Sequence, residues 1–566
     1  MTVHIEKFEL EINGSRPAPN RWYASPLVPV LVVIACLLPF LNKAFHIDDP
    51  LFIWTAKHIC RNPVDFYGFS LNWFNHVMPM AEMSPNPPMM AYYLALAGAL
   101  LGWTEVAVHL AFLVPAIAAT LGVFYLSRRL CSRPTLATLA VVLTPGFLVS
   151  GTTVMCDMMM LALWVWTILL WVKGIQNSNS RFLWLAALLM GPCALTKYIG
   201  LALIGLLFVY SLAEKRRLGW WVVPLFLPVL VIVGYEWASH LLYGRGLLAA
   251  AAAYTTKYAT TQSLQGGATA VQKVLMSLTF AGGCTATVFF ASPFLWSRKV
   301  WAAGFLVTAA MIVWLVVQNN FLAPVIAHPY MARWSFLLQA GFMAAAGVSI
   351  LSLAFEDLYR HRNAESLLLA LWVLGIFLFT AFLNWTVSAR NVLTLIPPAG
   401  ILLARKLEKT GAAGWSFPKW APAASLIPSA VLAILVAMAD TSLASTARRA
   451  AAEIPTALRG RGNAIWYEGH WGFQYYIDSE VIRPIDCTAW KLSPGDLIII
   501  PQNNSNLVPL PSDRVSSLPS MYFQPFRWAT VMNPTVGAGF YSHLWGPLPF
   551  VFGDIGPEQY FVFVVE

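Results

Sequence analysis

Five charged residues stand in or beside strongly apolar stretches of this sequence, where a charge is costly unless it is paired or functional. A carboxylate in such a place can take up a proton during a reaction, and a lysine or arginine can stabilise developing negative charge. They are Asp48 and Asp49 in HIDDP, Asp157 in TTVMCDMMMLAL, Lys197 in CALTKYIG and Arg390 in NWTVSARNV. These residues are the first candidates for chemistry.

Each candidate also has a structural interpretation. The run Asp48-Asp49-Pro50 is typical of a helix N-terminus, where carboxylates are favoured and proline fits the first turn. Asp157, Lys197 and Arg390 can cap a helix or extend toward the membrane surface. The sequence therefore leaves a functional and a structural role open for each residue taken singly.

The composition indicates the elements that must position these side chains. Of the 566 residues, 58% are hydrophobic and 11% are charged, and the mean hydropathy is +0.63. Soluble domains have roughly 45–50% apolar and about 25% charged residues. The composition excludes a disordered or water-soluble protein and indicates a multi-pass membrane protein.

The net charge of +10 is unevenly distributed. Residues 1–440 contain 28 Lys and Arg against 16 Asp and Glu, whereas residues 441–566 contain 8 against 10. The excess cations belong to the apolar part, where loop charge sets orientation, and they form no basic soluble face for nucleic acid. The seven cysteines show neither a CxxC pair nor metal-ligand spacing.

Thirteen apolar runs, from 26–45 to 423–440, suit helices that cross a membrane. If residues 1–25 are a cytoplasmic N-terminal segment, the alternate turns on that side hold 19 of the 28 cations, as the positive-inside rule requires. We expect residues 26–440 to form the transmembrane domain. The tail, residues 441–566, then lies outside the membrane.

The regions outside the membrane have patterns of their own. The first outer loop, residues 46–88, has apolar spacing that predicts interfacial helices. The tail is expected to form a small soluble α/β domain, with strands in NAIWY, FQYYI, DLIII and YFVFVVE. Glu82 and His240 also face outward on this topology. With Glu236 they form a candidate acceptor or metal site, although no ligand spacing requires a metal.

Several short motifs occur in an order that resembles the GT-C glycosyltransferases, nearest to the protein O-mannosyltransferases and the lipid A aminoarabinose transferase. The resemblance covers roughly residues 26–405. The motifs are HIDDP, NPPMMAYYLALAGALLG, SRRL, MCDMMML, ALTKYIG and SARNVLTLIPPAGILLARKL.

The resemblance implies an inverting glycosyltransferase in the bacterial inner membrane with a periplasmic active site. It would move a monosaccharide from a polyprenyl-phosphate donor to a hydroxyl of a lipid, protein or glycan acceptor. By the same resemblance, Asp48 would be the general base, with Asp49 beside it, and Asp157 a second acidic residue of the cavity. Lys197 and Arg390 would bind the donor phosphate. No cofactor is required, and a divalent metal is an option.

Two other classes of protein compete with this interpretation. A transporter favours charges near the membrane midplane and repeat-related halves, whereas here the candidates gather at one face and no repeat is visible. A membrane scaffold whose outer domain binds a partner would not need Asp48, Asp157, Lys197 and Arg390.

Overall fold

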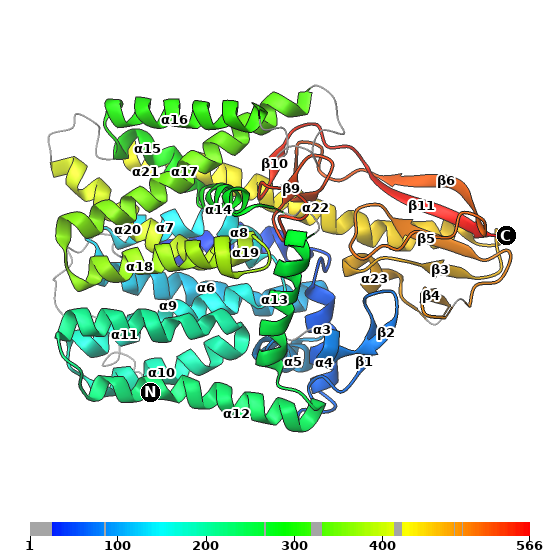
Figure 1. The fold of residues 1–566 in the computed structure, drawn as a ribbon, viewed down its shortest axis with the longest axis horizontal. Helices are drawn as coiled ribbons and strands as arrows, with labels where there is room; N and C mark the ends of the chain where they lie inside the picture. The colour runs from blue at the N-terminus through cyan, green and yellow to red at the C-terminus, as the bar shows by residue number, and fades with distance from the viewer. Residues whose placement is uncertain are drawn as a thin grey trace.

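The computed structural model describes residues 25–83, 86–264, 268–317, 331–412, 421–479, 481–489 and 491–566. The expected N-terminal segment, residues 1–25, lies outside these ranges except for Ser25. Figure 1 shows a bundle of roughly parallel helices on one side and a strand-rich part on the other. The last long helix, α22 (Leu426–Leu458), extends from the bundle into the strand-rich part.

Within the described ranges, seven helical segments are long and apolar enough to cross a membrane. The most buried of them is α9, whose N-terminal residue is Asp157. The segments are α6 (Glu105–Leu130), α9 (Asp157–Gln176), η3 with α11 (Tyr198–Lys215), η4 with α12 (Trp220–Tyr243), Trp334–His361 of α17 (Met331–His361), α18 with η5 (Ala364–Leu383), and α22.

Two further pairs of helices pass the same test together but are bent. Helices α7 (Pro134–Val142) and α8 (Pro145–Gly151) meet at 66°, and α14 (Ala270–Cys284) and α15 (Ala286–Leu295) meet at 83°. Pro145 explains the first bend, because it has no backbone N–H to continue the preceding helix. If each bent pair is counted as one span, the described ranges contain nine candidate membrane spans. A multi-pass helical membrane protein is confirmed, while the number thirteen stays a prediction.

Other helices of the bundle are not counted among these candidate spans. They are α2 (Leu27–Leu37), η2 (Leu38–Phe40), α3 (Asp49–Ile59), α4 (Met80–Met83), α5 (Met89–Leu101), α10 (Ser180–Thr196), α13 (Leu247–Leu264), α16 (Arg298–Val317), α19 (Ala389–Val392), η6 (Leu393–Leu395), α20 (Ile396–Ala412) and α21 (Ala421–Ala424). Figure 1 shows α3, α4, α5 and α13 together at the end of the bundle nearest the strands.

The first outer loop contains the expected helix and a small hairpin. Helix α3 begins at Asp49 with Pro50 in its first turn, as the sequence indicates. Asp48 occupies the N-cap position, but its side chain makes no capping hydrogen bond. The antiparallel hairpin of β1 (Ser70–Asn72) and β2 (Val77–Pro79) follows. The carboxylate of Asp48 is therefore not used in capping the helix.

The C-terminal part contains a mixed five-stranded sheet in the order β4-β3-β5-β11-β6. The first three strands are parallel, and β11 is antiparallel to both of its neighbours. The strands are β3 (Ile465–Tyr467), β4 (Ile482–Pro484), β5 (Leu497–Pro501), β6 (Val515–Phe523) and β11 (Glu558–Val565); short pairs are formed by β7 (Ala529–Thr530) with β10 (Val551–Phe552) and by β8 (Met532–Asn533) with β9 (Ala538–Gly539).

Three of the four predicted strand segments, NAIWY, DLIII and YFVFVVE, lie in β3, β5 and β11. The prediction for FQYYI is wrong, because this segment lies in helix α23 (Trp471–Ile477). Phe473, Gln474 and Ile477 are its buried residues in FQYYI, a spacing of three to four that matches a helix. A short aromatic run does not distinguish the two periods without its packing surface.

Candidate active site

Four of the predicted residues come from four separate elements. Asp48 precedes α3, Asp157 begins α9, Lys197 lies between α10 and η3, and Arg390 is in α19. Helix α9 begins where α8 has ended and the chain turns, so Asp157 lies at a helix end and not inside a span. A carboxylate in the first turn of a helix is also favoured by the helix dipole.

These four side chains form a continuous chain of ion pairs. Arg390 donates from Nη1 to Asp48 Oδ2 over 2.8 Å and from Nε to Asp157 Oδ2 over 2.7 Å. Lys197 Nζ donates to the other oxygen of Asp157, Oδ1, over 2.8 Å. The order Asp48–Arg390–Asp157–Lys197 thus alternates in charge, with every contact at hydrogen-bonding distance.

Exposure is lowest inside this chain of ion pairs and highest at its Asp48 end, while Lys197 at the other end is 22% exposed. The side chain of Asp157 is 1% exposed and that of Arg390 is 16% exposed, whereas Asp48 is 35% exposed. A buried carboxylate needs pairing, and two cations supply it for Asp157. Asp48 is the carboxylate that an incoming molecule can reach.

Asp49, predicted as a partner of Asp48, lies in a different environment. Its side chain is buried, and its two oxygens accept the backbone N–H groups of His46 and Val154, each over 2.9 Å. Burial raises the pKa of Asp49 to about 7, against the opposing effects of Lys43 and the two N–H groups. Through these hydrogen bonds the buried carboxylate of Asp49 joins the first outer loop to the segment before α9.

An aromatic cluster flanks the exposed end of the site. Tyr254 and Tyr258 of α13 lie with ring centroids 4.2 Å apart, and both contact Trp385, five residues before Arg390. Burial, the neighbouring Tyr258 and the negative charge of Asp48 together raise the pKa of Tyr254. Helix α13 crosses the end of the bundle in Figure 1.

The structure gives no support to the candidate metal site. The side chains of Glu82 in α4 and His240 in α12 (Phe226–Tyr243) are exposed. Glu236 instead accepts the backbone N–H groups of Leu248 and Ala249 at the start of α13, over 2.8 and 3.1 Å. In the described ranges no group of three or more His, Cys, Asp and Glu side chains is placed to hold a metal ion.

The sequence reasoning missed a second, fully buried ion pair. Lys43 Nζ pairs with Asp440 of α22, and both side chains have no exposed surface. Lys43 also donates to Thr152 over 3.3 Å, and the Tyr541 hydroxyl donates to Asp440 over 3.0 Å. The signal was present, because Lys43 and Asp440 are lone charges in the first and last apolar runs.

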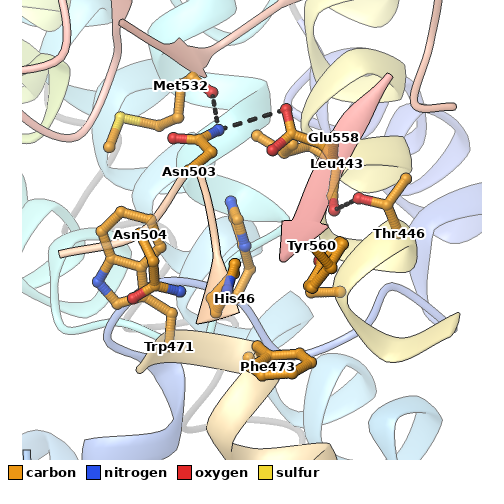
Figure 2. A pocket seen from close by; sticks show the side chains of 13 residues that line it. His46, Leu443, Thr446, Trp471, Phe473, Asn503, Asn504, Met532, Glu558 and Tyr560 are labelled. Carbon is orange, nitrogen blue, oxygen red and sulfur yellow. Dashed lines mark hydrogen bonds between the residues drawn. The ribbon is translucent and has the colours of Figure 1, made fainter. Parts of the chain in front are cut away.

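A small cavity lies where α22 meets the strands (Figure 2). His46, two residues before Asp48, lines it together with Trp471 and Glu558. Asn503 donates to Met532 O over 2.9 Å and to Glu558 over 3.3 Å. Within the described part of the chain, neither ring nitrogen of His46 has a hydrogen-bond partner. Figure 2 shows the imidazole of His46 reaching into the cavity from below Asn503.

A comparison with protein families bears on this arrangement. A family model described as dolichyl-phosphate-mannose-protein mannosyltransferase matches residues 85–243. The matched stretch contains Asp157 and Lys197, whereas Asp48 and Arg390 lie outside it and join them only in three dimensions. A search of curated proteins finds no match.

Solved structures of low sequence identity resemble the chain. The Archaeoglobus fulgidus oligosaccharyltransferase tethered to an acceptor peptide has 13% identity and a TM-score of 0.45, and the alignment covers 81% of this chain. This chain spans 63% of that protein. ArnT from Cupriavidus metallidurans bound to undecaprenyl phosphate has 13% identity and a TM-score of 0.44, with 84% and 93% of the two chains covered.

The arabinofuranosyltransferase AftD from Mycobacteria has 12% identity and a TM-score of 0.39, with 97% of this chain and 40% of that chain covered. The family match, the apolar helices and the motif order agree on one class of protein. The chain is a multi-pass helical membrane protein, and residues 85–243 match a family of membrane glycosyltransferases.

Proposed function

We propose that this chain moves a monosaccharide from a polyprenyl-phosphate donor to a hydroxyl of a lipid, protein or glycan acceptor. The observation that carries the proposal is the Asp48–Arg390–Asp157–Lys197 chain, in which the reachable carboxylate of Asp48 pairs with one cation and Asp157 links that cation to a second one. The resemblance to GT-C proteins and the family match over residues 85–243 support it. One structural neighbour is described as bound to undecaprenyl phosphate and another as tethered to an acceptor peptide.

In the proposed reaction, the acceptor oxygen attacks the anomeric carbon of the sugar while the bond to the phosphate oxygen breaks. Asp48 takes the proton of the acceptor hydroxyl, a contribution of about 10²–10⁴-fold. The electron pair of the broken bond stays on the polyprenyl phosphate, whose growing negative charge faces Arg390 and Lys197. Direct displacement by one acceptor inverts the configuration of the sugar.

Asp157 has a supporting role in this proposal. It is 1% exposed and pairs with Arg390 and Lys197 through different oxygens, so it fixes the separation of the two cations. The donor phosphate would compete with Asp48 for Arg390, because both are anions that fit a guanidinium. Donor binding would then release the Asp48 carboxylate for its work as a base.

The proposal includes a location and an orientation. The chain would lie in the bacterial inner membrane with its N-terminus in the cytoplasm, and the site and the C-terminal domain would face the periplasm. The charge distribution of the turns supports this orientation. We retain residues 26–440 and 441–566 as the two proposed domains, although α22 continues through this boundary to Leu458. A reporter fused after residue 566 that read as cytoplasmic would overturn the orientation.

The activity is tested with purified protein in lipid nanodiscs and a panel of undecaprenyl-phosphate monosaccharides, with release of undecaprenyl phosphate as the readout. We expect Asp48→Asn to lower turnover by at least about 100-fold while binding of undecaprenyl phosphate persists. Asp554→Asn, at an exposed carboxylate paired with Arg527, is the matched control. Full turnover by Asp48→Asn would exclude Asp48 as the base. Mass spectrometry of surface glycans from a deletion strain would identify the acceptor.

A further inference from the structure

The segment that carries Arg390 is held by a loop from the far end of the chain. The backbone N–H of Ala389 donates to Phe540 O over 2.8 Å, and the N–H of His543 donates to Val387 O over 2.8 Å. The N–H of Val387 in turn donates to the ring Nδ1 of His543 over 3.0 Å. Loop 540–543, between β9 and β10, thus supplies the hydrogen bonds that this segment lacks on its own.

These hydrogen bonds matter because residues 384–388 are neither helix nor strand. Buried backbone N–H groups need partners, and an irregular segment has no ladder of its own to supply them. The side chains of Thr386 and His543 are also buried, and Thr386 Oγ1 lies 2.9 Å from His543 Nδ1. The position of Arg390 at the start of α19 therefore depends on loop 540–543.

The same loop reaches the other side of the site. The Tyr541 hydroxyl donates to Asp440, which is paired with Lys43. The ring of Tyr541 also contacts the ring of His46 edge-on, with centroids 5.9 Å apart. His46 lies two residues before Asp48 and donates its backbone N–H to Asp49 over 2.9 Å. One four-residue loop is thereby connected to the segments that carry Arg390 and Asp48.

We propose that loop 540–543 is a positioning element, in which His543 fixes the Arg390 segment and Tyr541 fixes the start of the Asp48 segment. This inference rests on the proposed function and deepens it. The two residues of the ion pair come from segments that are distant in sequence, and a single loop contacts both. A misplacement of about 1 Å at a reacting centre can cost on the order of 10²-fold in rate.

His543 must be neutral to accept a hydrogen bond at Nδ1. Burial, reinforced by the charge of Lys273, lowers the pKa of His543 to about 4, so the ring is neutral at ordinary pH. Its Nδ1 then accepts from Val387 N–H, and Nε2 carries the proton. An asparagine at this position can offer its Oδ1 to the same N–H group, whereas an alanine cannot.

The test compares His543→Ala, His543→Asn and Leu544→Ala in full-length protein in nanodiscs. Leu544 is the next residue, its side chain is exposed, and it serves as the matched control. We expect His543→Ala to lower kcat by about 10–100-fold and to raise the donor KM, as Arg390→Lys does, and His543→Asn to recover most of both losses. Leu544→Ala should match the unaltered protein.

A double-mutant cycle with Arg390→Lys shows whether His543 acts through Arg390. In the Arg390→Lys background, His543→Ala should cost less than about twofold further, because coupled residues are not additive. Additive losses, or full kcat in both His543 variants, would overturn the positioning role. If His543→Ala does not fold, the test rests on His543→Asn. A folded His543→Asn protein whose kcat is as low as that of Arg390→Lys would also overturn the positioning role. Absence of sugar transfer by the unaltered protein would instead refute the proposed function.

Discussion

Arg390 and Asp48 are separated by 342 positions in the chain, yet Arg390 Nη1 lies 2.8 Å from Asp48 Oδ2. The same guanidinium uses Nε for Asp157. A planar group with donors in fixed directions suits this double contact, and it leaves Asp48 as the exchangeable, exposed partner. The finding makes Arg390 the residue on which the geometry of the candidate site depends.

Replacement of Arg390 by lysine should therefore not be conservative. A single ammonium group lacks the planar, fixed arrangement of donors by which the guanidinium reaches both Asp48 and Asp157. We expect Arg390→Lys to raise the donor KM and to lower kcat by about 10–100-fold in the nanodisc assay. Arg527→Lys, at an exposed surface ion pair, is the control and should leave both constants unchanged. Equal kinetics for Arg390→Lys and the unaltered protein would contradict this assignment.

Asp48 and Asp49 should respond differently to alanine. Asp49→Ala leaves two buried N–H groups, those of His46 and Val154, without their acceptor. The expected cost is about 1–3 kcal/mol for each group, seen as a lower apparent Tm and a lower yield of folded protein. Asp48→Ala should retain the Tm but lose turnover. The assignment fails if Asp49→Ala keeps its Tm and loses only turnover.

The buried pair of Lys43 and Asp440 should be important for stability, because each partner compensates the other. Removal of one alone, as in Lys43→Met, leaves a buried charge unpaired and should cost about 3–5 kcal/mol. The double variant Lys43→Met with Asp440→Leu removes both charges and should recover much of that loss. Thermal unfolding of the four proteins in one detergent measures the coupling, and purely additive effects would show that the pair is not coupled.

Glu558 should make stability depend on pH. Burial raises its pKa from 4.5 to about 7, so the folded chain holds a proton that the unfolded chain releases. Stability from this residue is present below about pH 4.5 and is lost as pH rises to about 7. Glu558→Gln should match the unaltered protein near pH 5 and exceed it near pH 8, by up to about 3 kcal/mol.

Apparent Tm values of both proteins from pH 5 to pH 8 test this prediction. Glu468, whose pKa burial also raises to about 7, is present in both proteins and cancels from the difference. A difference that does not change with pH would show that Glu558 does not titrate in this range.

Local patterns in the sequence were sufficient for the class of protein. Apolar runs, basic turns and the order of MCDMMML, ALTKYIG and SARNV predicted a multi-pass membrane protein that resembles GT-C glycosyltransferases. The described helices confirm the multi-pass membrane class, and a glycosyltransferase family model matches residues 85–243. The same patterns predicted three strand segments correctly. The strand prediction for FQYYI was wrong, because a short apolar run fits a helix as well as a strand. The sequence also does not settle the number of membrane spans, because a short apolar run can be a whole span or one half of a bent pair of helices.

The sequence by itself determined that Asp48, Asp157, Lys197 and Arg390 are charges in or beside apolar stretches, which lipid or a protein core would surround. A charge in such a place costs free energy unless it is paired or functional. Only the tertiary structure decided how they pair, and that Asp48 is reachable while Asp49 is buried. It also decided that a loop near the C-terminus holds the Arg390 segment. The reason is physical: contacts between residues hundreds of positions apart depend on how helices pack, which no local pattern encodes.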